Sequence, residues 1–335
     1  MTTATPAPSA TDSPTDLDVS VVLCTYNRAE VLPNALESLL HQDAAGVRYE
    51  IVLVDNNSTD PTRAVVESLA ARGGRYLRYV FEAKQGLAHA RNTGILSARA
   101  PIIAFTDDDV TVTPNWVAII KRTFDAHPEV DCIGGRVLPR WRPSPPSWLT
   151  REHWGPLALL DYGDEPFYVT ASRRLCLIGA NTAFRKDMFS RIGMLAPHVQ
   201  SMKREVATED HEILVRLWRS GGQGLYTPYL LVISEIASDR VAKCYHRRWH
   251  QRNGRFTAIM HDEGFEQTHV ARVLGVPAWL YRQAIEGAVQ CIGCLLSGQV
   301  DRAFLHEIKL RFSLGFVKAR WREFFSRGRP ENRRE

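Results

Sequence analysis

Short apolar runs alternate with amphipathic stretches along the first 110 residues, and this pattern predicts strands followed by helices. The predicted strands are Val19–Leu23, Ile51–Val54, Tyr76–Phe81 and Pro101–Thr106. Apolar pairs at helical spacing predict helices near residues 31–40 and 61–70, and Asp60 before Pro61 is typical of a helix start. Strands and helices that alternate at these intervals predict an α/β fold with a mainly parallel sheet.

Polar clusters follow three of the predicted strands. They are residues 25–28, 55–57 and 107–109. Ligands of such sheets bind beyond the carboxyl ends of the strands, so these clusters should meet in one crevice. No GxGxxG turn follows the first strand and no P-loop occurs. This argues against a dinucleotide-dependent oxidoreductase and leaves a metal as the means of neutralising a nucleotide's phosphates.

Three consecutive acids, Asp107, Asp108 and Asp109, follow the strand that ends at Thr106. Carboxylates this close repel one another, and a divalent cation with a preference for oxygen ligands removes that cost. The alternative is a solvated acidic turn. The neighbouring polar clusters favour the metal site.

The second half predicts further elements around the crevice. An aromatic, proline-rich loop at 140–148 is expected to cover a ligand or to form a surface connection. Cys176–Phe184 is predicted as a strand with small residues at 179–181 where a ligand approaches. Glu209 and Asp210 open an amphipathic helix, where acids are also expected from the helix dipole alone.

The C-terminal part is basic. After a strand at Leu225–Ile233, residues 245–255 predict a loop facing phosphate or metal, with a solvated charged face as the alternative. From Val276 onward the pattern is helical and basic, as in helices that lie on an anionic membrane surface. A helix pair packed on the main domain, with its charged edge in water, is the alternative.

The totals fit one large domain with an appendage: 335 residues, 44% hydrophobic, formal charge +5. The six cysteines show no disulfide-framework spacing. Residues 1–17 read as a disordered leader without a signal peptide, and no apolar run reaches the length of a membrane span. We therefore expect a cytoplasmic protein.

Four segments together resemble family 2 glycosyltransferases with the GT-A fold. They are residues 21–28 (VVLCTYNR), 54–58 (VDNNS), 86–92 (GLAHARN) and 105–109 (FTDDD). Gly179-Ala-Asn181 and Glu209-Asp210 fit the same family. The resemblance implies a catalytic domain at 18–255, with a nucleotide-binding half at 18–110 and an acceptor-binding half at 111–255. A basic, amphipathic helical region at 256–335 would follow.

The resemblance also implies roles for single residues in the nucleotide-binding half. Thr25, Asn27 and Asp55 would hold the base and ribose, usually of uridine. Arg91 would lie near that pocket. The family's DxD motif falls on residues 107–109, so that the first acid contacts the ribose or ion, Asp109 ligates the metal, and Asp108 contributes to the cofactor site.

In the acceptor-binding half, Asp210 matches the base of the family's ED motif, with Glu209 beside it. His246 or His250 stands where some members place a third metal ligand. Arg247-Arg-Trp249 only partly matches the QxxRW motif of processive synthases. A single sugar addition is therefore expected.

The implied activity is inverting transfer of a sugar from a nucleotide diphosphate sugar, most simply a UDP-sugar, assisted by Mg²⁺ or Mn²⁺. The acceptor would be a carbohydrate, a glycolipid or another hydroxyl compound. The inner face of the cell membrane is a further expected partner, through the C-terminal region, and nucleic acid is not. Two alternatives are a non-catalytic nucleotide-sugar-binding scaffold and a nucleotidyltransferase, although the latter lacks a triphosphate loop near the first strand.

Overall fold

A computed structural model describes residues 17–71, 76–142, 144–197, 209–261 and 269–326. The strands are β1 Val19–Thr25, β2 Tyr49–Asp55, β3 Leu77–Phe81, β4 Ile102–Asp107, β5 Val110–Val112, β6 Cys132–Trp141, β7 Phe167–Val169, β8 Thr182–Arg185, β9 Gly224–Ile236, β10 Arg272–Val273 and β11 Val276–Pro277. The helices are α1 Leu32–Leu40, α2 Thr62–Ala71, α3 Leu87–Ser97, α4 Trp116–Ala126, α5 Lys186–Ile192, α7 Glu209–Arg219, α8 Lys243–Met260, α10 Ala278–Leu296 and α11 Val300–Ser326. Short 3₁₀ turns are η1 Arg151–His153, η2 Gly155–Leu157, η3 Gly179–Asn181 and η4 Ser238–Val241.

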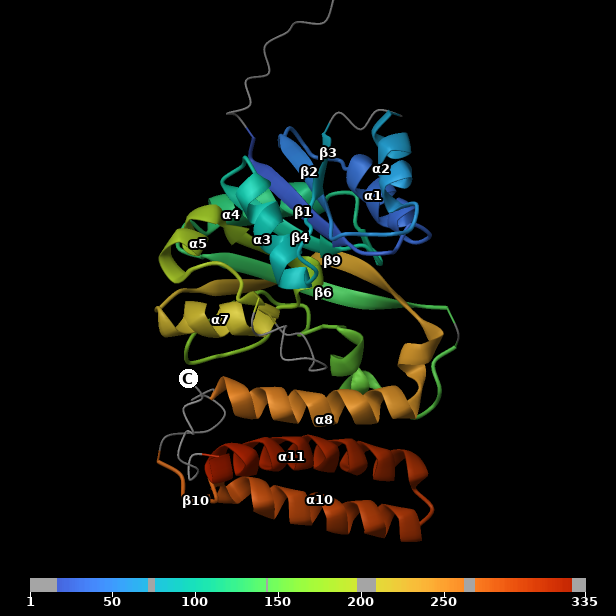
Figure 1. The fold of residues 1–335 in the computed structure, drawn as a ribbon, viewed down its shortest axis with the longest axis vertical. Helices are drawn as coiled ribbons and strands as arrows, with labels where there is room; N and C mark the ends of the chain where they lie inside the picture. The colour runs from blue at the N-terminus through green and yellow to red at the C-terminus, as the bar shows by residue number, and fades with distance from the viewer. Residues whose placement is uncertain (1–16, 72–75, 143, 198–208, 262–268, 327–335) are drawn as a thin grey trace, which may run out of the picture.

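A central sheet with helices packed against it confirms the predicted α/β fold (Figure 1). Within the described residues, the strand order is β3-β2-β1-β4-β8-β6-β9-β5, and β7 pairs with β9. Strands β3, β2, β1 and β4 are mutually parallel, as the alternating pattern predicts. Strand β8 then pairs antiparallel with both β4 and β6, so the second half of the sheet is mixed.

The register of the parallel strands brings the predicted polar clusters to one edge. Thr25 of β1 is paired with Asp55 of β2, and Cys24 of β1 is paired with Asp107 of β4. Helix α3 packs closely on β1, because a Cβ at Gly94 would lie 2.3 Å from the nearest methyl of Val22. The three strand ends therefore open into a common crevice, as expected for a parallel sheet.

Two sequence predictions of local structure are wrong. The predicted strand Cys176–Phe184 begins only at Thr182, because residues 179–181 form the turn η3. The predicted loop at 245–255 lies within the continuous helix α8. Its many cations hide the helical pattern, because the buried positions His246, Gly254, Phe256 and Ala258 lie on more than one side of the helix. Gly254 faces α11, whereas Phe256 contacts His211 of α7.

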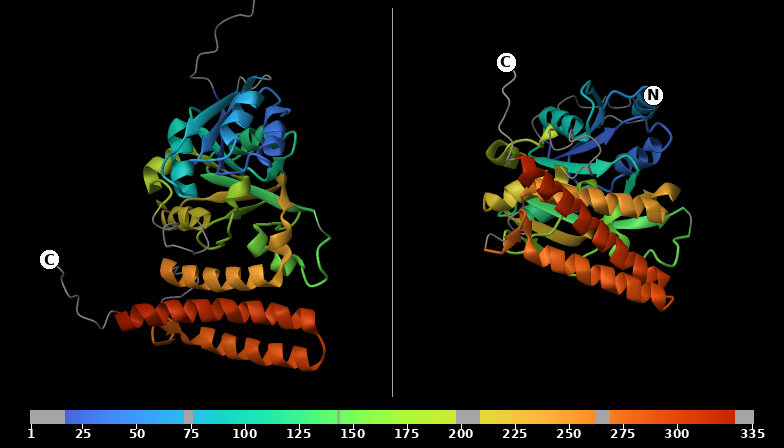
Figure 2. Two further views of the ribbon diagram at one scale, coloured as in Figure 1. Left: turned by 45° about the vertical axis from the view of Figure 1, so that its right-hand side comes forward. Right: turned by 60° about the horizontal axis from the view of Figure 1, so that its bottom comes forward.

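The C-terminal helices form a layer at one end of the molecule, opposite the edge that β2 and β3 form (Figures 1 and 2). Helices α8 and α11 cross closely, since a Cβ at Gly254 would lie 2.0 Å from the Phe312 carbonyl oxygen. A Cβ at Gly315 would meet the Gln251 carbonyl oxygen at the same distance. The expected domain boundary at residue 255 falls inside α8.

Helices α10 and α11 make a hairpin whose second helix packs on α8. In the parts of the chain that the structure describes, no helix is both long and apolar enough to span a bilayer. The predicted leader falls outside the described residues except for Leu17, and so does the basic stretch after Ser326.

Candidate active site

The acid run lies in the tight turn between β4 and β5. Asp107 is the last residue of β4, and Asp109 directly precedes β5. The backbone of Asp109 is fixed from the other side, since its carbonyl accepts a hydrogen bond from the Glu235 amide of β9 at 3.1 Å. This turn therefore places three carboxyl groups at the crevice on short, rigid connections.

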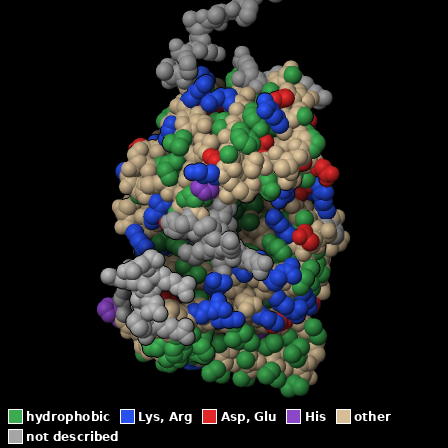
Figure 3. All heavy atoms as spheres, viewed as in Figure 1, with side chains coloured by type: hydrophobic (Ala, Val, Ile, Leu, Met, Phe, Trp, Pro, Cys, Tyr) green, Lys and Arg blue, Asp and Glu red, His purple; other side chains and the backbone are tan. Residues whose placement is uncertain are grey.

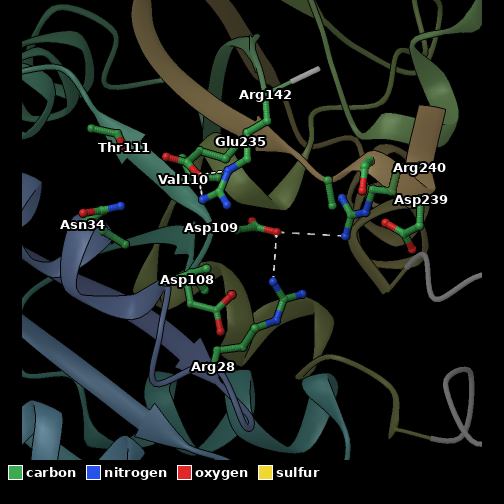
Figure 4. A pocket seen from close by; sticks show the side chains of 14 residues that line it. Arg28, Asn34, Asp108, Asp109, Val110, Thr111, Arg142, Glu235, Asp239 and Arg240 are labelled. Atoms are coloured by element: carbon green, nitrogen blue, oxygen red, sulfur yellow. Dashed lines mark hydrogen bonds and ion pairs between the residues drawn. The ribbon is translucent and has the colours of Figure 1, made fainter. Parts of the chain in front are cut away.

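Two arginines from distant segments face the Asp109 carboxylate (Figure 4). Arg28, from the loop after β1, lies 3.4 Å away, and Arg240, from the turn η4, lies 4.0 Å away. Asp109 keeps about a fifth of its side-chain surface exposed. The site thus places a carboxylate that can ligate a metal beside two arginines that can bind a diphosphate.

Loss of solvent raises the pKa values of the other two acids of the run. Asp108 is 8% exposed and accepts a hydrogen bond from the Thr25 hydroxyl at 2.7 Å. Burial raises the pKa of Asp108 to about 7, against the opposing effect of that hydrogen bond. Asp107 keeps 38% of its side-chain surface exposed. Partial loss of solvent, together with the charges of Asp109 and Asp210, raises its pKa to about 6 against the opposing effect of Arg91. Both carboxyl groups are ones that a cation would stabilise in the charged form.

Arg91 connects the acid run with the predicted base. Its side chain is 4% exposed, and the guanidinium pairs with Asp107 at 3.3 Å and, more closely, with Asp210. The other carboxylate oxygen of Asp210 accepts a hydrogen bond from the Gly179 amide at 3.0 Å. A Cβ at Gly179 would lie 2.3 Å from Asp210 Oδ1, so only glycine leaves space for this carboxylate. Gly179 of η3 thus makes room for, and hydrogen-bonds to, the Asp210 side chain in the first turn of α7, which begins at Glu209.

Of the three residues predicted to hold the base and ribose, Thr25 lines a cavity of about 490 Å³, whereas Asn27 and Asp55 do not line it and instead hold the loops beside it. Asp55 is buried, accepting hydrogen bonds from the Ser58 amide at 2.9 Å and from the Tyr79 hydroxyl at 2.7 Å. Burial and the bond to Asp55 raise the pKa of Tyr79 to about 12. Asn27 links the two loops, because its side-chain oxygen accepts the Thr59 amide at 2.7 Å.

This cavity opens at the ends of β1 and β4, and an adjoining cavity of about 560 Å³ shares part of its wall. The shared lining residues are Arg28, Asp108, Asp109, Val110 and Arg240. The first cavity is further bounded by Thr25, Asn56 and Gly86, and the second by Arg142 and Glu235 (Figure 4). Asp109 and its two arginines therefore stand between two adjoining spaces.

The structure does not bring the two predicted histidine ligands to the acids. His246 is fully buried against Trp148, His153 and Phe304, and its Nε2 lies 3.1 Å from the Arg240 carbonyl oxygen. His250 follows it on α8, and neither histidine lines either cavity. This packing argues against a histidine metal ligand. Among the described residues no group of three or more His, Cys, Asp or Glu side chains is arranged to hold a metal.

Sequence reasoning missed the contribution of Arg28 and Arg240. Arg28 lies in the quoted motif at 21–28, which was its available signal. Arg240 follows β9 in a turn with no motif around it, and only the pairing of β9 with β5 brings it to Asp109. The tertiary fold, rather than local sequence, supplies this cation.

The chain belongs to glycosyl transferase family 2, whose sequence model matches residues 20–193. It is similar to the glucosyl-dolichyl phosphate glucuronosyltransferase of Haloferax volcanii, with 23% identity over 211 residues. That match covers 62% of this chain and 65% of the relative. It is also similar to a validoxylamine A glucosyltransferase of Streptomyces hygroscopicus, with 43% identity over 30% of this chain and 24% of the relative. The chain thus spans less than two thirds of either relative.

Two solved structures share the fold. The mannosyltransferase PcManGT of Pyrobaculum calidifontis, in complex with GDP-Man and Mn²⁺, is 20% identical with a TM-score of 0.61, covering 92% of this chain and 89% of that one. Residues 1–349 of S. aureus TarS in complex with UDP are 15% identical with a TM-score of 0.51, covering 94% and 93%. At these identities the similarity establishes the fold alone.

Proposed function

We propose that this protein transfers a single sugar from a nucleotide diphosphate sugar, a UDP-sugar in the simplest case, to an acceptor hydroxyl with inversion. The observation that carries the proposal is the Asp107–Arg91–Asp210 bridge beside a cavity at the ends of β1 and β4. It joins the acid run that would hold a diphosphate to a carboxylate that would receive a proton. Family membership supports the reaction class.

The donor set fits a divalent cation that arrives with its substrate. Asp107 and Asp109 offer hard oxygen ligands, and both line the cavity of about 490 Å³. Mg²⁺ is commonly held by one or two carboxylates together with substrate phosphates, so a cage of protein ligands is not required. When bound, Mg²⁺ or Mn²⁺ would supply Lewis-acid stabilisation of the leaving diphosphate.

The protein's own residues would act at both ends of the reaction. Arg28 and Arg240 would bind the diphosphate beside Asp109 and stabilise the charge that grows as the bond between the sugar and the phosphate oxygen breaks. Asp210 would accept the proton of the acceptor hydroxyl while the acceptor oxygen bonds to the anomeric carbon of the sugar. Attack from the face opposite the diphosphate would give inversion.

The pocket geometry would position the two substrates. Thr25 and Asn56 line the cavity of about 490 Å³, which is proposed to hold the nucleotide, and Asn27 and Asp55 hold the loops around it. Asp210 is joined through Arg91 to Asp107 in the wall of this cavity, so the acceptor would approach the sugar from that side. A carbohydrate or glycolipid hydroxyl would enter there, and we place the reaction at the cytoplasmic side of the membrane.

A donor screen tests this function. The full chain is incubated with UDP-, GDP- and dTDP-sugars and Mn²⁺, and released nucleoside diphosphate is measured with and without candidate acceptors. We expect diphosphate release from one donor class, increased by the correct acceptor. Release of inorganic pyrophosphate from a nucleoside triphosphate would instead identify a nucleotidyltransferase, and donor binding without any release would identify a scaffold.

A further inference from the structure

Helix α10 exposes an apolar stripe on the outside of the molecule. The exposed fractions are Ile285 65%, Val289 64%, Ile292 57%, Leu295 54% and Leu296 85%. Ile285, Val289, Ile292 and Leu296 follow helical spacing, so they share one face. Figure 3 shows hydrophobic side chains gathered over this end of the molecule, where α10 forms the outermost layer. A face of this kind marks a contact with another apolar phase.

Helix α11 continues the apolar surface and adds positive charge. Leu314, Trp321 and Phe325 are exposed at 51%, 40% and 60%, and they line a groove of about 850 Å³ between α11 and α8. Lys318 and Arg322 line the same groove. The groove therefore combines aromatic side chains with two cations on one side of a helix, which is the composition of a helix at a lipid interface.

The charges of the hairpin are unbalanced in the direction that favours an anionic surface. Its four acids are engaged in ion pairs: Glu286 with Arg282, Asp301 with Lys243, Glu307 with Arg247 and Arg311, and Glu323 with Arg320. Lys318 and Arg322 form no ion pair with any other described residue. The nine residues that follow Ser326 in the sequence add four arginines and two glutamates.

We propose that the face formed by the α10 stripe and the α11 groove docks on an anionic lipid bilayer. The apolar side chains would enter the boundary of headgroups and acyl chains, and Lys318 and Arg322 would contact the anionic headgroups. A second copy of this chain is the less suitable occupant, because a self-complementary contact at this face would bring two positive grooves together. A bilayer satisfies the apolar stripe and the cations at once.

Vesicle flotation of the full chain tests the proposal without requiring any sugar transfer. Phosphatidylcholine vesicles are compared with vesicles that also contain phosphatidylglycerol. We expect binding to the anionic vesicles, weakened by salt. The combined variant Lys318→Gln, Arg322→Gln should bind roughly thirtyfold more weakly, from about fivefold for each cation. The variant Ile285→Ser, Val289→Ser, Ile292→Ser should lose binding.

The matched control is Leu96→Ser, which removes an even more exposed apolar side chain, 76% accessible, from α3. It should bind vesicles like the unchanged protein. Equal binding of all variants, or equal binding to neutral and anionic vesicles, would overturn the proposal. So would a concentration-dependent dimer, measured by light scattering, that the serine variant abolishes while vesicles bind neither protein. All variants should keep their affinity for nucleotide sugar, which separates this proposal from the proposed function.

Discussion

At the scale of single residues, the proposed chemistry depends on the orientation of Asp210. The ion pair with Arg91 fixes one carboxylate oxygen, and the Gly179 amide fixes the other. Both partners come from segments far away in the chain, α3 and η3. The carboxylate is thus held in place before any substrate binds.

Replacing Asp210 with Asn tests its role as the base. The amide keeps the shape of the side chain but takes no proton, so transfer should fall by about 10²- to 10⁴-fold. The affinity for the donor, measured by calorimetry, should change little. If Asp210→Asn transferred sugar at the wild-type rate, Asp210 would not be the general base.

Gly179→Ala should disturb the same carboxylate indirectly. The added Cβ would overlap Asp210 Oδ1, so the carboxylate must move, and a displacement of about 1 Å costs on the order of 10²-fold in rate. The measurement is kcat at saturating donor. Gly287→Ala on α10 is the control, since a Cβ there meets nothing within 4 Å. An unaffected kcat in Gly179→Ala would show that the contact with Gly179 does not position Asp210.

The buried histidines predict a loss of stability in acid. Burial lowers the pKa of His246 and of His250 to about 4, below the unfolded value of about 6.5. Between these values the unfolded chain binds more protons, so the stabilisation is fully present above about pH 6.5 and is lost as the pH falls towards 4. Protonation of His246 would leave Nδ1–H without a partner among the described residues.

We expect the free energy of unfolding to drop by about 1–2 kcal/mol per histidine between pH 7 and pH 5, in addition to the effects of other groups. Urea titrations at the two pH values measure it. His246→Phe should show a smaller drop, and the exposed His41→Gln should match the unchanged protein. If His246→Phe lost as much stability as the unchanged protein, burial of His246 would not be the cause.

How far the sequence predicts the site also differs by residue. Asp107 and Asp210 carry local signals, a strand end and a helix start, so the sequence predicts their positions. Arg240 reaches Asp109 only through the pairing of β5 with β9, which no local pattern encodes. His246 is buried by Trp148 and Phe304, which lie about 100 and 60 residues away in sequence. No local sequence pattern could therefore predict its burial.

At the scale of elements, the parallel half of the sheet was predictable and the α8 region was not. Apolar runs such as Ile51–Val54 are buried on both faces, so they read as strands. Helix α8 was predicted as a loop because cations occupy most of its exposed positions. Its close contact with α11 depends on two glycines, Gly254 and Gly315, because a Cβ at either position would overlap the backbone of the facing helix. The sequence alone does not show which helices face each other.

Gly315→Leu should separate α11 from α8. The side chain would overlap the backbone of Gln251, and overpacking of this kind costs about 1–3 kcal/mol or more. The midpoint temperature of thermal unfolding should fall, and the backbone amides of α8 should exchange hydrogen faster. Gly293→Ala, at an open position on α10, should leave stability unchanged or raise it by up to about 1 kcal/mol. Equal effects of the two variants would contradict the close crossing.

At the scale of the whole molecule, two surfaces lie in different parts of the same architecture. The crevice lies at the carboxyl ends of the parallel strands, and the apolar hairpin forms the layer beyond α8 (Figures 1 and 3). The resemblance covers the first surface, whereas the second was visible in sequence only as a basic helical pattern. Its exposed stripe could be recognised once the packing of α11 on α8 showed which positions remain uncovered.

The central claim is that the acid run after β4 binds a nucleotide diphosphate sugar together with a divalent cation. Calorimetric titration of the full chain with UDP-sugars, with and without Mn²⁺, measures this most directly. We predict binding that Mn²⁺ strengthens, and a loss of that strengthening, by about tenfold or more, in Asp109→Asn. Donor binding that is identical with and without Mn²⁺, or unaffected by Asp109→Asn, would contradict the claim.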